Sequence, residues 1–160
     1  MLTPEQYEAV GRLSLAFNEL EYAIELYTAF LISTPEWSVS EKLAGQGTFR
    51  HKAERFKDIL EAIGQEHPIL FPRTEELTGL VKQAQALAKE RNRYVHALVV
   101  HDFQHNTTHL RGRRGDFECN ETEVIFLASS ADALSFQIAN EGAALHEALV
   151  DLRAIADEGG

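Results

Sequence analysis

The sequence is poor in cysteine and in long apolar segments. A single cysteine, Cys119, stands among the 160 residues, so no disulfide can form within the chain. No apolar run approaches the roughly 20 residues that a membrane-spanning helix requires, which excludes a protein that resides in a bilayer. The first residues, MLTPEQ, lack the basic and apolar pattern of a secretory signal. We therefore expect a cytoplasmic protein with no membrane partner.

Basic residues are also scarce. The chain has 15 Lys and Arg against 25 Asp and Glu, a formal net charge of −10. A field of that sign repels polyanions and excludes a protein that coats nucleic acid along its length. A glycine-rich phosphate loop is missing as well, because Gly45 and Gly47 follow no predicted strand. No recognisable motif surrounds a serine or cysteine nucleophile. The scarcity of basic residues does not exclude one local basic site.

The length and the 44% hydrophobic content suit one domain that spans residues 1–160. Thr3, Pro4 and Gln6 form a capping box with proline at the first helical position, which predicts a helix start. Apolar residues then recur every three or four positions until Pro35 ends the pattern. The same spacing predicts three further helices. Thr48 caps the first of them, a turn at Pro72 leads into the next at Thr74, and Ser129 or Ser130 caps the last.

The predicted helices are joined by shorter segments of different character. We expect the second helix to end at Gly64, the third to reach Leu98 and the fourth to extend to Ile155. Residues 33–48 predict a loop with a short helix at Ser40 to Leu43. Between residues 99 and 127, apolar and polar residues alternate, which predicts a β-hairpin or a three-stranded excursion that includes the 124–127 run. The predicted fold is mainly α, a four- to five-helix bundle with a small hairpin inserted before the last helix.

The basic residues are concentrated in one part of the sequence. Residues 82–114 contain seven basic and two acidic side chains, a balance of +5, whereas the rest of the chain carries −15. Such segregation is typical of an anion site on an acidic protein. The alternative is a solvated hairpin that is basic without a ligand.

Arg91 is the most informative residue of this segment. On the predicted third helix it shares the apolar seam with Leu87 and Val95. Because an unpaired guanidinium is costly to bury, Arg91 must either pair with an acid or face a polar cleft. Glu21 on the first helix is the candidate partner for a structural ion pair. The other interpretation makes Arg91 part of a functional site.

Residues 90–96, ERNRYVH, resemble the Arg-x4-His motif of the HEPN superfamily (higher eukaryotes and prokaryotes nucleotide-binding domains), in which a polar residue follows the arginine. Members are bundles of four or five helices, and the motif lies near the end of the third long helix, as it does here. The resemblance implies metal-independent RNA cleavage in active members, often by toxins or defence proteins. It also implies a site assembled across a homodimer.

The resemblance assigns a role to each residue of the motif. His96 would act as general acid or base on the ribose 2′-hydroxyl, Arg91 would hold the scissile phosphate, and Asn92 would position His96 or the phosphate by hydrogen bonding. Further basic residues would guide the RNA backbone, namely Arg93, Arg111, Arg113 and Arg114. No metal or other cofactor is implied. Other members are non-catalytic modules that bind a nucleotide or a partner protein. For this chain, the resemblance implies an antitoxin or a nucleotidyltransferase as the partner protein.

His101, His105 and His109 raise a separate question, because they are spaced by four residues. Two residues four positions apart on an extended strand are separated by about 13 Å. One metal ion cannot bind both histidines of such a pair unless a turn at Asn106 folds the segment back. One hypothesis is therefore a metal-binding regulator centred on the hairpin. The other is that these are exposed hairpin histidines without a ligand.

Overall fold

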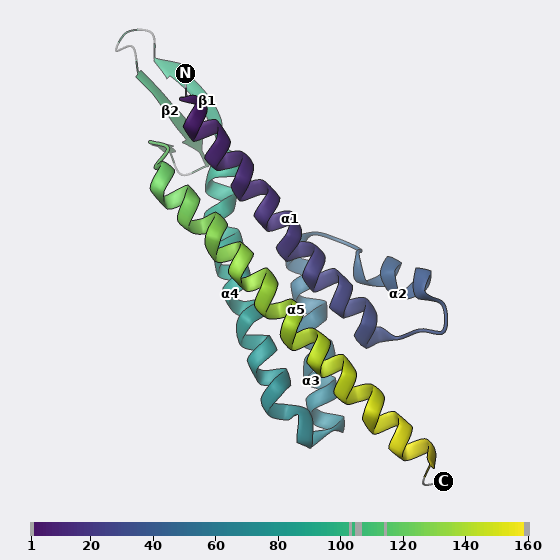
Figure 1. The fold of residues 1–160 in the computed structure, drawn as a ribbon. Coiled ribbons are helices and arrows are strands. Elements are labelled where there is room, and N and C mark those ends of the chain that lie inside the picture. Colours follow the sequence, from purple (N-terminus) through teal and green to yellow (C-terminus); the bar gives the residue numbers. More distant parts are fainter. Residues whose placement is uncertain (1, 103, 105–106, 114, 159–160) are drawn as a thin grey trace.

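The computed structural model describes residues 2–102, 104, 107–113 and 115–158. Its long helices form a bundle, and a small antiparallel sheet precedes the last helix (Figure 1). This confirms the predicted mainly α fold with a hairpin insertion. The elements in chain order are α1 (Pro4–Ile32), α2 (Trp37–Ala44), α3 (Phe49–Glu66), the 3-10 helix η1 (Pro68–Leu70), α4 (Phe71–Val95), β1 (Leu98–Asp102), β2 (Thr107–Gly112), β3 (Gly115–Phe117) and α5 (Glu121–Glu158).

Helix α1 begins where the sequence predicts. The Thr3 hydroxyl accepts a hydrogen bond from the Gln6 amide at 3.2 Å, and the Gln6 side chain accepts one from the Thr3 amide at 3.0 Å. This capping box satisfies two of the backbone N–H groups that a helix start leaves unpaired. After Ile32 the chain turns at Ser33, which has a φ of 47°, and enters α2. Helix α2 is longer than the predicted segment from Ser40 to Leu43.

Helices α1 and α5 lie side by side and run in the same direction, away from the end that carries the sheet (Figure 1). They approach closely at Gly142, where a Cβ would lie 2.6 Å from Tyr27 Cγ. Helix α4 packs on α5 and α3, while α3 also contacts α1. The interior between them is filled by large, fully buried side chains, including Leu13, Phe17, Leu20, Phe56, Leu60, Leu77, Ile138 and Leu145.

Several predicted helix boundaries are wrong, beginning with those around the connection between α3 and α4. Helix α3 does not stop at Gly64 but continues to Glu66, and Gly64 is buried where a Cβ would lie 2.7 Å from Thr74 Oγ1. The glycine therefore permits a close contact rather than a helix end. Helix α4 begins at Phe71, so Pro72 stands in its first turn rather than in a turn before it, and the Thr74 hydroxyl donates to the Phe71 carbonyl at 3.0 Å.

The sheet begins and ends earlier than predicted. Helix α4 ends at Val95 and the chain enters β1 at Leu98. Strand β2 pairs antiparallel with both neighbours, so that Val100 lies opposite His109 and Leu110 opposite Phe117. The predicted inclusion of residues 124–127 is wrong, because these residues are helical.

Helix α5 starts before Ser129 and Ser130, so neither serine is its N-cap. Asn120 Oδ1 accepts a hydrogen bond from the Glu123 amide at 3.1 Å, which satisfies a first-turn donor. The Ser130 hydroxyl instead donates to the Phe126 carbonyl at 2.8 Å inside the helix. None of the helices in the described residues combines the length and apolar character needed to cross a bilayer.

At the end of the bundle that carries the sheet, side-chain contacts connect the helices with one another and with β3. Tyr94, at the end of α4, is buried and donates its hydroxyl proton to Glu123 of α5 at 2.5 Å. Its ring meets that of Phe117 edge-on, with 5.6 Å between centroids. Gln6 of α1 donates to the Cys119 carbonyl at 3.1 Å. These contacts fix the last turn of α4 between the sheet and α5.

Candidate functional site

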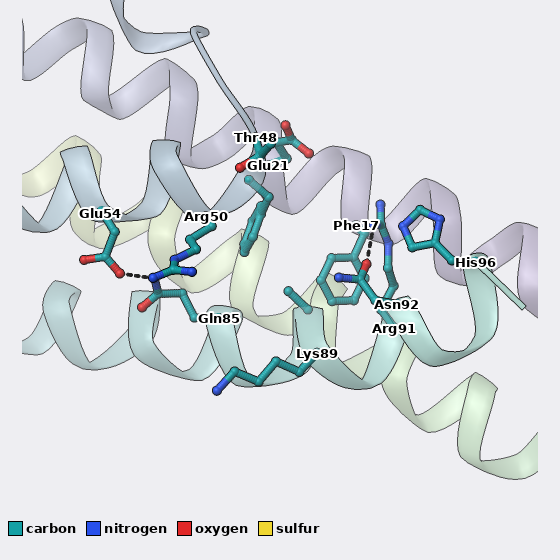
Figure 2. A pocket seen from close by; sticks show the side chains of 12 residues that line it. Phe17, Glu21, Thr48, Arg50, Glu54, Gln85, Lys89, Arg91, Asn92 and His96 are labelled. Atoms are coloured by element: carbon teal, nitrogen blue, oxygen red, sulfur yellow. Dashed lines mark hydrogen bonds between the residues drawn. The ribbon is translucent and has the colours of Figure 1, made fainter. Parts of the chain in front are cut away.

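A cleft of about 790 Å³ lies where side chains of α1, α3 and α4 converge (Figure 2). This volume is within the range of roughly 300–1,000 Å³ that is usual for small-molecule sites. Its walls combine polar and charged side chains with the rings of two phenylalanines. The cleft is lined by Phe17, Glu21, Thr48, Phe49, Arg50, Glu54, Gln85, Ala88, Lys89, Arg91, Asn92 and His96.

Arg91, Asn92 and His96 of the predicted site share this cleft. The Arg91 guanidinium lies over the Phe17 ring, 5.2 Å from its centroid, and its Nη1 donates to Asn92 Oδ1 at 2.9 Å. Its Nε is buried and has no hydrogen-bond partner within the described structure. His96 follows the last residue of α4, and its side chain is exposed. The cleft thus combines a fixed guanidinium with an accessible imidazole.

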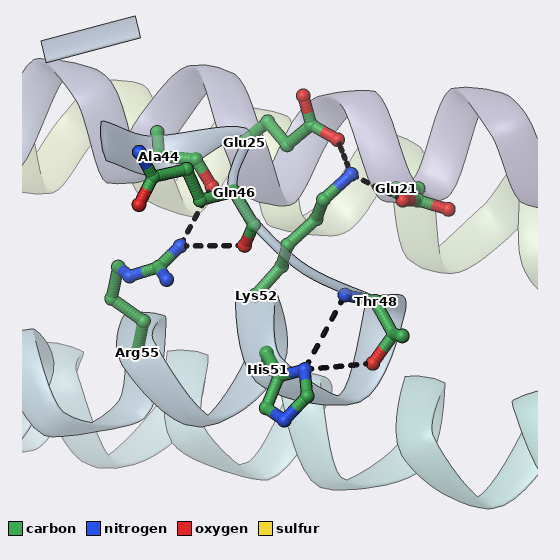
Figure 3. A network of polar contacts seen from close by, with 8 residues as sticks. All are labelled: Glu21, Glu25, Ala44, Gln46, Thr48, His51, Lys52 and Arg55. Atoms are coloured by element: carbon green, nitrogen blue, oxygen red, sulfur yellow. Dashed lines mark hydrogen bonds and ion pairs between the residues drawn. The ribbon is translucent and has the colours of Figure 1, made fainter. Parts of the chain in front are cut away.

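The structural ion pair considered for Arg91 is wrong, because Glu21 has another partner. Glu21 accepts a hydrogen bond from the Lys52 ammonium at 2.5 Å, and Glu25 accepts from the same ammonium (Figure 3). Desolvation lowers the pKa of Lys52, but hydrogen bonds to the two carboxylates outweigh it and leave the pKa above its usual value. Glu21 lines the cleft as a carboxylate bound to Lys52, and Arg91 lines the same cleft without an ion pair to Glu21.

The loop before α3 forms one wall of the cleft and is held by polar contacts (Figure 3). Arg55 donates from Nη1 to the carbonyls of Ala44 and Gln46 at 3.0 and 3.1 Å. Gly47 adopts a φ of 91°, in the left-handed region that favours glycine. These contacts set the position of Thr48, the residue of this loop that reaches the cleft.

The sequence predictions missed the residues that α3 contributes to the cleft. Phe49, Arg50 and Glu54 all line it, and Arg50 is exposed. One signal was present in the sequence: the first turn of α3 contains basic side chains and no acid. Cations are unfavourable at the positive end of a helix dipole, so their presence there calls for nearby anions. Lys52 finds such anions in Glu21 and Glu25.

The other predicted RNA-contacting residues do not line the cleft. Arg93 packs over the Phe117 ring at 4.5 Å and lies 3.8 Å from Glu123. Arg111 makes two hydrogen bonds to Asp116, at 2.8 and 3.0 Å. Arg113 is exposed in the turn between β2 and β3, and Arg114 lies outside the described residues. The basic segment of the sequence is therefore divided among several places in the structure.

The hairpin histidines are only partly described. His109 Nε2 lies 2.9 Å from Asp116 Oδ2. The side chain of His101 and the whole of His105 lie outside the described part of the chain. Within that part, no group of three or more His, Cys, Asp or Glu side chains is arranged to hold a metal ion.

The chemistry available in the cleft is that of a site for a phosphate ester. A guanidinium offers paired donors to phosphate oxygens, and an exposed imidazole can exchange a proton near neutral pH. Lys89 and Arg50 add positive charge to the opposite end. In comparisons with family models, curated proteins and solved structures, no match to this chain was found, so the assignment of a function depends on the cleft itself.

Proposed function

We propose that this cleft binds single-stranded RNA and cleaves it without a metal ion, as the resemblance to the HEPN superfamily implies. The observation that carries the proposal is the convergence of Arg91, Asn92 and His96 on one cleft. The buried Arg91 Nε without a partner in the described structure adds to it, because a buried donor of this kind usually meets an acceptor. A phosphate oxygen supplies such an acceptor.

In the proposed reaction, the ribose 2′-oxygen attacks the adjacent phosphorus and the bond from phosphorus to the 5′-oxygen breaks. The products are a 2′,3′-cyclic phosphate and a 5′-hydroxyl end. His96 accepts the 2′-hydroxyl proton or donates a proton to the leaving oxygen, while Arg91 stabilises the charge that develops on the phosphoryl oxygens. Asn92 accepts a hydrogen bond from Arg91 and so orients the guanidinium.

The reaction needs two proton transfers, and the carboxylates of the cleft are already engaged. Glu21 is bound by Lys52, and Glu54 lies 2.9 Å from Lys57 and accepts from Gln85. His96 is therefore the acid–base group that the described lining residues leave available. The predicted homodimer would bring a second His96 and complete the pair.

The test is cleavage of a labelled RNA oligonucleotide in the presence of a chelator. We expect His96→Ala to slow cleavage at least 100-fold, which is the lower range for loss of a general acid or base. Arg91→Lys keeps the charge but removes the planar fork, so we expect it to be impaired as well. Lys82→Ala, on the same helix and outside the cleft, is the matched control. Equal rates for His96→Ala and the unaltered protein would refute the proposal.

A second candidate function is binding of a nucleotide without turnover. It is favoured by the engagement of both cleft carboxylates, which leaves a single chain short of one proton-transfer group. In this case the protein binds the RNA oligonucleotide in a manner that Arg91→Ala weakens, but produces no cyclic phosphate.

A further inference from the structure

We propose that the end of the cleft farthest from His96 is a second phosphate subsite, formed by Arg50 and Lys89, with Phe49 as a base platform between the two sites. The proposal rests on the proposed function, because it takes Arg91 and His96 as the first phosphate site. It adds the class of ligand: a single strand with two neighbouring phosphates, in preference to a ligand with one.

The cleft is long enough for such a ligand. Gln85 and His96 both line it and are 11 residues apart on or directly after α4. At a rise of 1.5 Å per residue, this separation corresponds to about 16 Å. Neighbouring phosphates of a helical strand are separated by about 3.4 Å along the axis, and an extended strand separates them further. The cleft is therefore longer than a site for one phosphate needs to be.

Two cations from opposite walls define the second subsite. Arg50 is in the first turn of α3, and Lys89 is on α4, where Figure 2 shows its side chain extending along the helix toward the Gln85 end; both line the cleft. Both side chains are exposed, and among the described residues neither has a carboxylate in direct ion-pair contact, although the charge of Arg50 acts on Glu54 from farther away. Each is thus available to a phosphate group that enters between α3 and α4.

The nearby carboxylate does not cancel this positive charge. Glu54 accepts hydrogen bonds from Lys57 and Gln85, which together lower its pKa. Its negative charge is compensated by Lys57 at 2.9 Å. Arg50 and Lys89 consequently give their end of the cleft a net attraction for an anion.

Phe49 directly precedes Arg50 in the chain, and its ring contacts Phe17, the residue over which Arg91 lies. Its ring is half-buried and meets Phe17 edge-on, with 6.3 Å between centroids and 69° between planes. The Arg91 guanidinium stacks on the ring of Phe17. Phe49 lines the cleft, and no described guanidinium stacks on its ring. Bases of any type stack on an aromatic side chain, so this platform suits single strands of varied sequence.

The experiment measures binding of 2′-deoxy oligonucleotides, which lack the attacking hydroxyl and stay intact. A labelled dinucleotide with one phosphate is compared with a trinucleotide with two, both of mixed sequence. We expect the unaltered protein to bind the trinucleotide about tenfold more tightly, and Arg50→Ala/Lys89→Ala to bring this ratio close to one. The salt dependence of trinucleotide binding should also decrease, by about 0.7 in the slope of log K against log salt concentration.

The matched control removes two positive charges elsewhere. Lys82→Ala/Arg153→Ala changes two exposed residues outside the cleft and should retain the tenfold ratio. An unchanged ratio in Arg50→Ala/Lys89→Ala, an equal loss in the control, or no trinucleotide preference in the unaltered protein would overturn the subsite. The proposed function fails separately: if the ratio depends on Arg50 and Lys89 but RNA is not cleaved, the subsite stands and the nuclease proposal falls.

Discussion

At the scale of single residues, the charge held between Glu21 and Glu25 matters most for stability. The Lys52 side chain is only 11% exposed, and its ammonium contacts both carboxylates. A buried cation of this kind is tolerated because its partners compensate the lost hydration. Lys52 thereby joins α3 to α1 beside the cleft.

Replacement of this lysine should destabilise the fold. We expect Lys52→Met to lower the free energy of unfolding by about 2 kcal/mol, because it leaves two partly buried carboxylates close together without a counter-charge. Urea denaturation followed by circular dichroism measures the change. Lys82→Met, at an exposed position of α4, should remain within about 0.5 kcal/mol of the original protein. Equal effects of the two substitutions would contradict the stabilising role of Lys52.

The raised pKa of Lys52 also predicts a pH dependence. Its stabilising contribution is complete below the unfolded-state pKa of about 10.4 and is lost as the pH rises through the higher folded-state value. The difference in stability between the original protein and Lys52→Met should therefore shrink in strongly alkaline solution and stay constant near neutral pH. A difference that grew with pH would show that the ammonium is not the source.

Tyr94 offers a second test at this scale. Burial, followed by its hydrogen bond to the Glu123 carboxylate, raises the pKa of this phenol well above its usual value. We expect Tyr94→Phe to cost about 1.5 kcal/mol of stability through loss of a hydrogen bond to a charged acceptor. It should also remove the last component from the ultraviolet titration of the four tyrosines. Tyr22→Phe, at a 61% exposed position, should leave that last component in place.

At the scale of elements, the close approach of α1 and α5 depends on Gly142. Alanine is the better helix former by about 1 kcal/mol, but its Cβ here would lie 2.6 Å from Tyr27 Cγ. We expect Gly142→Ala to destabilise the protein by about 1–3 kcal/mol, as overpacking does. Gly11→Ala, where a Cβ meets nothing within 4 Å, should instead be stabilising. Thermal denaturation of the two variants gives shifts of opposite sign if this account is right.

The sequence predicted the helices better than their boundaries. The start of α1 was predictable, because Thr3 and Gln6 interact locally and make the same hydrogen bonds in the structure. The start of α5 was not, because the apolar run at 124–127 fits a strand and a helix equally well. Tertiary packing decides the matter: Val124, Leu127 and Ala128 have helical spacing and are all buried in the bundle.

The candidate site was predictable in part for a similar reason. Arg91, Asn92 and His96 are close in sequence, and one helix and its end suffice to bring them together. Arg50 and Phe49 reach the same cleft only because α3 packs beside α4, a contact between distant segments that local patterns do not specify. Arg93 was assigned to RNA from its charge alone, yet it packs against Phe117 on a different side of α4.

At the scale of the whole molecule, the net charge of −10 limits how the protein can contact nucleic acid. Lys52, Arg93 and Arg111 are engaged with acids of the protein itself. Arg50, Lys89 and Arg91 remain free of ion pairs to other described residues and share the cleft. Under the proposed function, this distribution of charge favours a short stretch of single strand, because the net negative charge repels a long polyanion elsewhere.

This arrangement predicts a modest dependence of binding on salt. Contact with two phosphates of a single strand should give a slope of about −1.4 for log K against log salt concentration. Titrations with oligonucleotides of increasing length should show the slope reaching this value at three nucleotides and then remaining constant. A slope that continued to steepen with length would instead indicate an extended basic surface outside the cleft.

The contact between Gln6 and the Cys119 carbonyl has a practical consequence. The thiol of Cys119 is buried, and burial raises its pKa, so little reactive thiolate is present near neutral pH. Access to the sulfur requires the junction of α1, β3 and α5 to open. Cys119 is the only cysteine of the chain. The rate at which a thiol reagent labels the native protein therefore measures how often this end of the bundle opens.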